Sequence, residues 1–227
     1  MKLFNAIMLI LFILIIDQFS KFFVKTNFLY GEEFQVFSWF KVNFIENEGM
    51  AWGTVIPGKY GKLILVIFRI IAVCGIGYWL WDVTSRNKSA FLAVAVSLIF
   101  AGAFGNIIDS VYYAIMFDNS TPTHLATFFP PDHYGTWFQG RVVDMFYFPI
   151  WEGFFPEWIP KLGGQPFTFF NAIFNVADFS ISVGVGILIF FNKRAFAPPK
   201  ARDGVTFSSK VDHDPFEYDP NERLYKL

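Results

Sequence analysis

The strongest constraint on the fold is a series of four apolar blocks, each long enough to cross a lipid bilayer. They cover approximately Leu3–Val24, Leu63–Trp81, Ala90–Met116 and Phe169–Phe191. A membrane-spanning helix needs about twenty predominantly apolar residues. Of the 227 residues, 54% are hydrophobic and only 16% are charged, whereas a soluble domain of this size needs a charged surface. The sequence therefore predicts an integral membrane protein.

The distribution of basic residues predicts the orientation of these blocks. Arg86 and Lys88 lie in the short link between the second and third blocks, and Lys193 and Arg194 follow the last block. Lys and Arg are enriched in cytoplasmic segments close to membrane helices. We therefore expect this link and both termini to be cytoplasmic, and the two long loops to lie outside.

The two outer loops have different compositions. The first, about residues 25–61, contains the alternating runs Phe34–Phe37 and Phe40–Ile45, which predict two short strands. The second, about residues 117–168, is rich in Pro, Trp and Phe. Because amphipathic aromatic side chains favour the membrane interface, we expect this loop to lie against the lipid headgroups.

These features together predict the fold class and the domain organisation. We expect an all-α membrane protein with four transmembrane helices, a small extracytoplasmic β-sheet and an interfacial aromatic loop or helix. Residues 1–191 would form the transmembrane domain. Residues 192–227 mix Pro, Lys, Asp and Glu without an apolar period, which predicts a poorly ordered cytoplasmic tail.

Polar side chains recur at helical spacing near the outer ends of the first and third blocks. Residues three or four apart share one face of a helix. Asp17, Ser20 and Lys21 are spaced in this way, and an internal ion pair of Asp17 with Lys21 is expected. In the third block the polar face consists of Gly102, Asn106 and Asp109, whose simplest role is close packing and hydrogen bonding to a neighbouring helix. Arg69 in the second block is interpreted as a snorkelling or paired charge.

The last block begins with a polar stripe. If the helix includes Phe170 and the residues after it, then Asn171, Asn175, Asp178 and Ser182 lie on one face. An ionisable group in such a place costs several kcal/mol unless it faces a partner or water. Asp178 is therefore a candidate functional residue that requires a partner elsewhere in the chain.

Asp144 is the candidate partner for Asp178. It lies in the second outer loop, within Gly140–Phe146, and has apolar neighbours on both sides. An isolated loop aspartate is usually just solvated. The apolar neighbours favour the alternative that the chain descends here to the level of Asp178.

Two carboxyl groups that share a site at the membrane surface permit a specific chemistry. They do not both ionise easily, so one keeps a proton while the other acts as a base toward water. The base activates the water for attack on a carbonyl, and the acid polarises that carbonyl and then protonates the leaving amine. This is the chemistry of aspartic peptidases. Acidic groups at helix ends also serve proton or cation pathways, and that alternative remains open at this point.

The sequence gives little indication of other chemistry. The three histidines, His124, His133 and His213, lie in loops or the tail without metal-ligand spacing, and we expect no metal site. No dinucleotide-binding or P-loop glycine pattern occurs, so no organic cofactor is expected. The net charge of -1 gives no indication of a nucleic-acid partner, and none is expected. The single cysteine, Cys74, excludes an internal disulfide.

Five sequence blocks, in this order, resemble the lipoprotein signal peptidases, also called signal peptidase II. The family patterns are Asp-x-x-Ser-Lys, Asn-x-Gly-x-Ala-aromatic, Gly-Gly-x-x-Gly-Asn-x-x-Asp, Gly-x-Val-Val-Asp-Phe and Phe-Asn-x-Ala-Asp. A single match would be weak, but five in order cover nearly all of the membrane region. The corresponding segments are Asp17–Lys21, Asn47–Gly53, Ala101–Asp109, Gly140–Met145 and Phe174–Asp178.

The resemblance implies a role for each matched residue. Asp144 and Asp178 would be the catalytic aspartates, and Asp17 with Lys21 would support the site from the first helix. The residues that would shape the site or bind substrate are Asn47, Gly49, Asn106, Asp109, Arg141 and Asn175.

The resemblance also implies a reaction and its partners. The substrate would be a diacylglyceryl-modified prolipoprotein, cut on the amino side of the lipidated cysteine. The enzyme would be a monomer in contact with membrane lipid in the inner membrane of a bacterium, with its active site at the outer face. Globomycin-like cyclic peptides would inhibit it by occupying the same site.

This chain departs from the family pattern in two respects. The family usually has Arg directly after the aspartate of the third-helix motif, whereas this chain has Ser110. Any contact of that Arg would be lost or supplied by another residue such as Arg141. The connections from Asp109 to Asp144 and from Asp144 to Asp178 are also longer than usual, which affects how the site is covered.

Two functions from other classes compete with the peptidase. A small transporter or proton channel could use Asp17, Asp109 and Asp178 as a relay, but a relay should place ionisable groups through the depth of the bilayer. The second alternative is a non-catalytic membrane protein that binds lipid or a partner. In that case it would be a coincidence that both Asp144 and Asp178 occur in their motifs.

Overall fold

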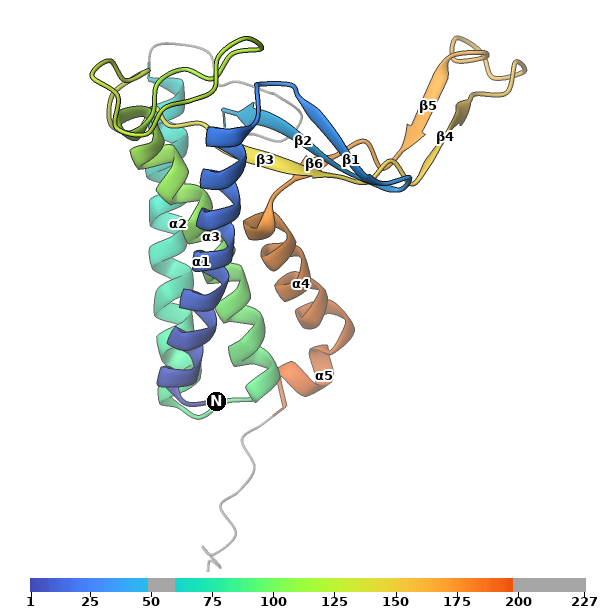
Figure 1. The fold of residues 1–227 in the computed structure, drawn as a ribbon. Coiled ribbons are helices and arrows are strands. Elements are labelled where there is room, and N and C mark those ends of the chain that lie inside the picture. Colours follow the sequence, from blue (N-terminus) through green and yellow to red (C-terminus); the bar gives the residue numbers. More distant parts are fainter. Residues whose placement is uncertain (49–59, 198–227) are drawn as a thin grey trace, which may run out of the picture.

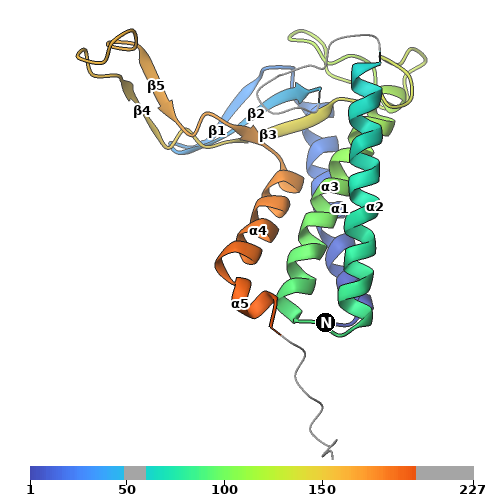
Figure 2. The ribbon, with the colours of Figure 1, turned by 180° about the vertical axis from the view of Figure 1, so that it is seen from behind.

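The computed structural model describes residues 1–48 and 60–197. Within them, three long helices stand side by side and a small sheet lies across one end of the bundle, as Figures 1 and 2 show from opposite sides. The N-terminus lies at the other end of the bundle. In chain order the elements are α1 (Leu3–Asn27), β1 (Glu33–Phe37), β2 (Phe40–Asn47), α2 (Gly61–Ser85), α3 (Ala90–Met116), β3 (Val142–Tyr147), β4 (Trp151–Phe154), β5 (Pro166–Phe169), β6 (Ile173–Phe174), α4 (Val176–Phe190) and α5 (Asn192–Ala195).

Helices α1, α2 and α3 are each long and apolar enough to cross a membrane. They coincide with the first three predicted blocks and extend each of the first two by a few residues. Many of their large apolar side chains are exposed, as expected for surfaces that face lipid. The chain is therefore a membrane protein with several apolar helices.

The fourth block differs from its prediction. Helix α4 has 15 residues, which corresponds to a length of about 22 Å, and a bilayer core is about 30 Å thick. The predicted helix around Phe170 and Asn171 is wrong, because Phe170 has a φ of 64°, outside the right-handed helical region. Asn171 is exposed and lies before the helix, so the predicted stripe from Asn171 to Ser182 does not form.

Asn175 determines where α4 begins. Its side-chain oxygen accepts a hydrogen bond from the backbone N–H of Asp178 at 2.9 Å, and the Asp178 carboxylate accepts one from the Asn175 N–H at 3.4 Å. This reciprocal pair is a capping box, which satisfies backbone donors that a helix start leaves without partners. The polar residues at this point therefore end a strand segment and begin a helix.

The sheet combines both outer loops. Strands β1 and β2 match the two predicted in the first loop, and the strand order is β1-β2-β3-β6, with each pair antiparallel. Strand β3 pairs Asp144 with Ile45 of β2, and it pairs Phe146 with Phe174 of β6. The all-α prediction is therefore too narrow, because the second loop contributes strands as well.

The aromatic part of the second loop forms a hairpin, not the predicted loop or helix. Strands β4 and β5 pair between Trp151 and Phe169 and between Phe154 and Pro166. The hairpin projects from the far end of the sheet, away from the helices (Figure 1). Several of its aromatic side chains are largely exposed, including Trp151, Phe154 and Trp158.

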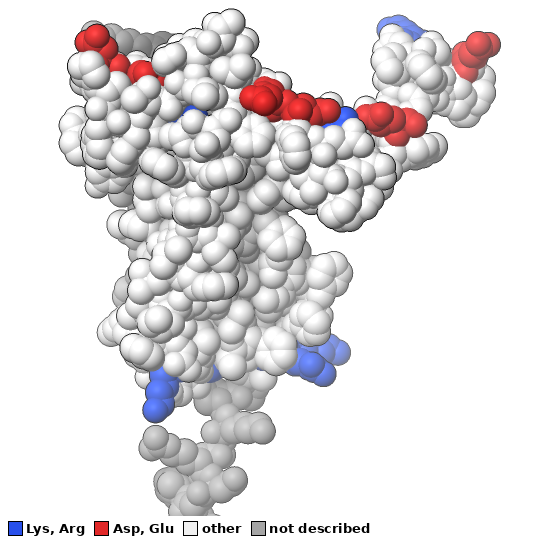
Figure 3. Space-filling view, viewed as in Figure 1, with Lys and Arg blue, Asp and Glu red and all other residues white. Residues whose placement is uncertain are grey.

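The charges divide along the long axis of the molecule. On the face drawn in Figure 3, Asp and Glu gather at the level of the sheet and the hairpin with a few Lys and Arg among them, only Lys and Arg appear at the opposite end, and the surface between is almost free of charge. Ser89 in the link before α3 donates a hydrogen bond to the Arg194 carbonyl at 2.6 Å, so this link and α5 lie at the same end. This division matches a protein that crosses a bilayer.

Close packing of α3 on α4 depends on small residues. A methyl group at Gly102 would lie 2.2 Å from the Ala177 carbonyl oxygen, and one at Gly184 would lie 2.7 Å from the Ala95 carbonyl oxygen. Small residues permit such close approach of helices in membranes. This contact places the first turn of α4 directly beside α3.

We predict that Gly102→Ala lowers the stability of the protein by about 1–3 kcal/mol, because the added methyl group forces α3 and α4 apart. Thermal unfolding in detergent measures the effect. The matched control is Gly75→Ala in α2, where an added methyl group meets no atom within 4 Å. Equal melting temperatures for both variants would contradict the packing argument.

Candidate active site

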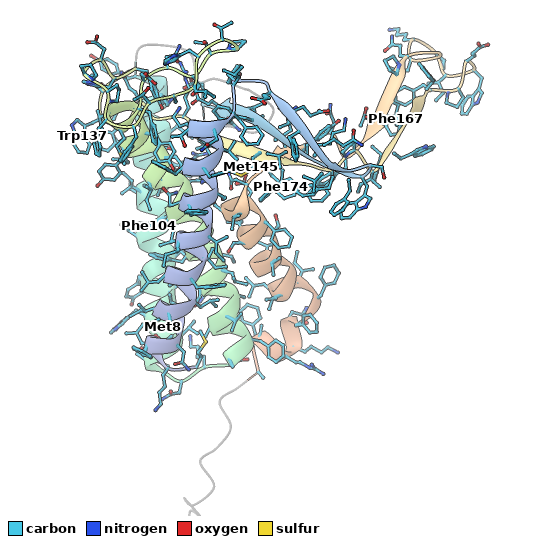
Figure 4. The ribbon with its side chains drawn as sticks, in the orientation of Figure 1. Met8, Phe104, Trp137, Met145, Phe167 and Phe174 are labelled. Carbon is cyan, nitrogen blue, oxygen red and sulfur yellow. The ribbon has the colours of Figure 1, made fainter. Side chains whose placement is uncertain are left out.

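The candidate site lies where the sheet meets the beginning of α4. Met145 and Phe174, labelled in Figure 4, mark this junction. Asp144 precedes Met145 on β3 and is 3% exposed, whereas Asp178 lies in the first turn of α4 and is half-buried. The two aspartates therefore come from segments that are far apart in the sequence but adjacent in the fold.

The side chain of Asn175 joins the two aspartates. Its Nδ2 donates to Asp144 Oδ1 at 2.7 Å and to the Val143 carbonyl oxygen at 3.2 Å. Its Oδ1 accepts from the backbone N–H of Asp178 at 2.9 Å. One buried amide thus contacts the strand that carries Asp144 and the helix that carries Asp178.

Two further amides orient the carboxyl groups from other elements. Asn106 of α3 donates to Asp178 Oδ1 at 2.9 Å. Asn47, the last residue of β2, donates to Asp144 Oδ2 at 3.3 Å. Amide donors fix the positions of carboxyl oxygens without adding a formal charge beside them.

The pKa of Asp144 is raised to about 7. Burial is the largest cause, because it disfavours the charged form, and repulsion by Asp178 adds to it. The hydrogen bonds from Asn47 and Asn175 act in the opposite direction but are smaller. Asp144 therefore holds a proton under conditions in which an ordinary aspartate is ionised.

A buried lysine supports the pair from α1. The Nζ of Lys21 lies 2.7 Å from Asp109 Oδ2 and 2.9 Å from Asp17 Oδ2, and it donates a hydrogen bond to Asn106 Oδ1 at 2.8 Å. The predicted Asp17–Lys21 ion pair is confirmed. Through Asn106, this lysine is connected to Asp178.

Asp17 also fixes the start of α4. Its Oδ1 accepts a hydrogen bond from the backbone N–H of Ala177 at 2.8 Å. A carboxylate at this position accepts from a backbone N–H that has no partner within the helix, and its negative charge interacts favourably with the positive end of the helix dipole. The contact ties α1 to the helix that carries Asp178.

Gln18 is a site residue that the sequence analysis did not single out. Its Nε2 donates to Asp109 Oδ1 at 2.9 Å and to Asp17 Oδ2 at 3.0 Å, and its Oε1 accepts from the Tyr113 hydroxyl at 3.2 Å. The available signal was a polar residue next to Asp17 in an apolar helix. Ser20, in contrast, donates a hydrogen bond to the backbone carbonyl of Asp17 in its own helix at 2.8 Å.

Arg141 points to a second polar cluster, not to the two aspartates. Its guanidinium lies 3.1 Å from Glu46 Oε2 and 3.1 Å from Glu48 Oε1, so it pairs with these glutamates and not with Asp144 or Asp178. Lys25, one turn beyond Lys21, is fully buried and pairs with Glu46 while it donates to Ser120 at 2.9 Å. This cluster fastens the second outer loop to the end of α1 and to β2.

The predicted site residues fall into three groups. Those brought together around the aspartates are Asp17, Lys21, Asn47, Asn106, Asp109, Asp144, Asn175 and Asp178. Arg141 lies in the second cluster described above. Gly49 lies outside the described residues.

The residues that the structure describes contain no group of three or more His, Cys, Asp or Glu side chains placed to hold a metal ion. Asp17 and Asp109 do lie together, but the Lys21 ammonium fills the position between them. At Asp144 and Asp178 the site presents two carboxyl groups and the amide groups that donate to them.

Fold and site define a membrane protein that carries a carboxyl pair at the end of its helical bundle, and comparisons with known proteins assign it to a family. The sequence pattern of the family described as Signal peptidase (SPase) II matches residues 9–193. A lipoprotein signal peptidase of Porphyromonas gingivalis is 45% identical over 184 residues, which are 80% of this chain and 79% of that protein. One of Amoebophilus asiaticus is 36% identical over 188 residues, which are 80% of this chain and 74% of that protein.

A solved structure of a membrane enzyme has a similar fold. A bacterial membrane enzyme determined by the in meso method at 1.9 Å resolution is similar, with a TM-score of 0.56 and 26% sequence identity. The similarity covers 84% of this chain and 93% of that one. The chain belongs to the signal peptidase II family and is therefore a peptidase, that is, a hydrolase of the membrane.

The second cluster yields a prediction. Glu46→Gln leaves the charge of buried Lys25 without its carboxylate partner, and breaking such a pair costs about 3–5 kcal/mol. Glu33→Gln is the control, because its pair with Lys41 is partly exposed and worth about 0–1 kcal/mol. Thermal unfolding of both variants in detergent measures the difference. A loss of stability in Glu33→Gln as large as that in Glu46→Gln would contradict a stabilising role of the buried Lys25–Glu46 pair.

Proposed function

We propose that this chain removes the signal peptide from diacylglyceryl-modified prolipoproteins and cuts on the amino side of the lipidated cysteine. Membership of the signal peptidase II family supports the class of reaction, and the relatives named above carry the name lipoprotein signal peptidase. The observation that carries the proposal is the contact of the Asn175 side chain with Asp144 and with the first turn of α4 that holds Asp178.

Asp144 and Asp178 form the proposed catalytic pair, and their surroundings support a different role for each. Asp178 lies at the N-terminal end of α4 and accepts a hydrogen bond from Asn106, both of which favour a carboxylate, so it is the base. Asp144 is buried and retains its proton, so it is the acid. Asp178 takes a proton from water, which attacks the scissile carbonyl, while Asp144 protonates the carbonyl oxygen.

The tetrahedral intermediate then collapses. The C–N bond breaks, and the leaving amine of the lipidated cysteine receives the proton that Asp178 took from water. As the carbonyl reforms, its hydroxyl proton returns to Asp144. The two groups end in their initial protonation states, and one water molecule has been consumed for each peptide bond.

The orientation in the membrane follows from the charges. We infer that all four apolar helices cross the bilayer of the bacterial inner membrane, with the short α4 completed by the turn into α5. Lys2 precedes α1, and Lys193 and Arg194 belong to α5; the N-terminus and α5 both lie at the end of the bundle opposite the sheet (Figure 1), and these basic residues favour the cytoplasm for both termini. The catalytic pair then lies at the outer face.

This placement suits a lipid-modified substrate. The diacylglyceryl group remains in the outer leaflet and holds the adjacent peptide bond at the level of the sheet, so part of the entropy of positioning is lost before the reaction. Membrane lipid surrounds the exposed apolar helices of a monomer. Globomycin-like cyclic peptides, which present a peptide and an acyl chain together, would compete for the same position.

The alternative of a transporter or proton channel is less well supported. The segments 3–16, 70–81, 90–108 and 179–191 contain no Asp, Glu, Lys or Arg. Asp17, Asp109 and Asp178 all lie in the part of their helices nearest the sheet, whereas a proton or ion relay needs polar groups through the full depth of the bilayer. No observation favours this second function.

We predict that Asp144→Asn and Asp178→Asn each reduce kcat by about 10⁴-fold or more, because neither variant can complete the acid–base cycle. The assay follows cleavage of a lipidated precursor peptide in detergent micelles. The control Asp132→Asn changes an exposed outer-loop aspartate and should keep full activity. Full turnover by either dyad variant, with the protein folded, would exclude that residue from catalysis.

The pKa of Asp144 leads to a prediction on pH dependence. Because Asp144 donates a proton and loses it as the pH rises through about 7, kcat/KM should fall above that pH by tenfold per unit. The hydrogen bond from Asn47 lowers this pKa, so Asn47→Ala should move the alkaline limb to higher pH. Profiles of kcat/KM from pH 5 to 9 measure both effects, and a profile that stays flat to pH 9 would contradict the role of Asp144.

A further inference from the structure

The buried carboxyl groups near the site outnumber the cation that neutralises them. Asp17 and Asp109 share Lys21, and both are completely buried. If the catalytic pair holds one proton, three ionised carboxylates surround a single ammonium group. Ionised carboxylates in a membrane protein require nearby compensating charge, so a second cation is expected close to the pair.

Arg69 of α2 lies on the face of its helix that packs against α3. Val66 and Val73, three residues before it and four after it, are 1% and 6% exposed. They belong to one packed cluster with Ile107 and Val111 of α3. Residues at these offsets share a face, so Arg69 projects toward the part of α3 that contains Asn106 and Asp109.

The electrostatic interactions of Arg69 agree with this position. Its guanidinium interacts most strongly with Asp178, then with Asp109 and with Asp144. The other cations of this region face elsewhere within the described residues. Lys25 pairs with Glu46, Lys62 pairs with Glu48, and Arg141 pairs with both of these glutamates.

We propose that Arg69 is a positioning residue for the reaction, which keeps Asp178 ionised as the base and leaves the shared proton on Asp144. The inference rests on the proposed function and adds a residue from α2, a helix that contributes no other group to the site in the described contacts. A guanidinium suits this task, because it remains charged at every pH at which the enzyme works.

The groups that act on Asp178 come from α1, α2, α3 and β3 and from Asn175, the residue that caps its own helix. Asn106 of α3 and the Asn175 N–H donate to its carboxylate. Asp144 of β3 repels it, and Arg69 of α2 attracts it. Lys21 of α1 acts on it through Asn106. Removal of Arg69 therefore leaves two hydrogen bonds in place but removes the cation of α2 that opposes the repulsion by Asp144.

The test compares the pH profiles of kcat/KM for the wild type, Arg69→Met and Arg69→Lys, measured in detergent with a lipidated precursor peptide. In Arg69→Met the acidic limb should move to higher pH by on the order of one unit, and further than the alkaline limb, because Asp178 is the main partner. Arg69→Lys, which keeps the charge, should restore the wild-type limb. Arg86→Met, at the other end of α2, is the matched control and should leave both limbs unchanged.

A purely structural role gives a different result. In that case Arg69→Met lowers activity by the same factor at every pH, the limbs stay in place, and Arg69→Lys behaves like Arg69→Met; this result would overturn the proposal. If Arg69→Met does not fold, Arg69→Gln takes its place with the same expected shift. If Asp144→Asn and Asp178→Asn are inactive but the limbs of the Arg69 variants do not move, only the inference about Arg69 is refuted. If Asp144→Asn or Asp178→Asn is active, the proposed function is refuted.

Discussion

The arrangement of the site depends on one buried ammonium group. Lys21 is completely buried, and its ammonium nitrogen forms ion pairs with the carboxylates of Asp17 and Asp109 and donates a hydrogen bond to the side-chain oxygen of Asn106. A charge in such a position is tolerated only when its partners are in place. The ion pairs therefore fix α1 against α3, and the second oxygen of Asp17 fixes the start of α4. The energetic cost of burying these charges selects one packing of the three helices.

The two aspartates proposed for catalysis are held differently from those around Lys21. Their carboxyl oxygens receive hydrogen bonds from Asn47, Asn106 and Asn175, which carry no charge. A lysine in direct contact with either carboxyl would stabilise its ionised form and prevent one of the pair from keeping a proton. Because the charged groups around Lys21 are separate from the amides around Asp144 and Asp178, Lys21 orders the helices while the pKa of Asp144 stays raised. Asn106 connects the two sets of groups, because its side-chain oxygen accepts a hydrogen bond from Lys21 and its side-chain nitrogen donates one to Asp178.

Much of this could be predicted from the sequence, and the failures have a common cause. Spacing of four residues predicts the Asp17–Lys21 pair, and alternation predicts β1 and β2. The start of α4 was misplaced because Phe and Ile suit a strand and a membrane helix equally well, so an apolar run does not reveal the cap at Asn175. The partners of Arg141 were also missed, because its contacts with Glu46 and Glu48 depend on how β2 and β3 pair. Short-range periodicity identifies faces of elements, but it does not identify contacts between them.

Helix α1 solves a problem specific to this site, which joins an extramembrane strand to a membrane helix. Asp144 belongs to β3, and its position relative to α4 would vary if the sheet could tilt on the bundle. Lys21 and Lys25 lie about one turn apart, on the order of 6 Å along the same face of α1. Lys21 holds α3 and, through Asp17, α4, whereas Lys25 holds Glu46 of β2, the residue before Asn47. Strand β2 in turn pairs with β3 beside Asp144. One face of α1 thus fixes the height of both the sheet and α4. This keeps the carboxyl groups of Asp144 and Asp178 close together although 33 residues separate them in the sequence.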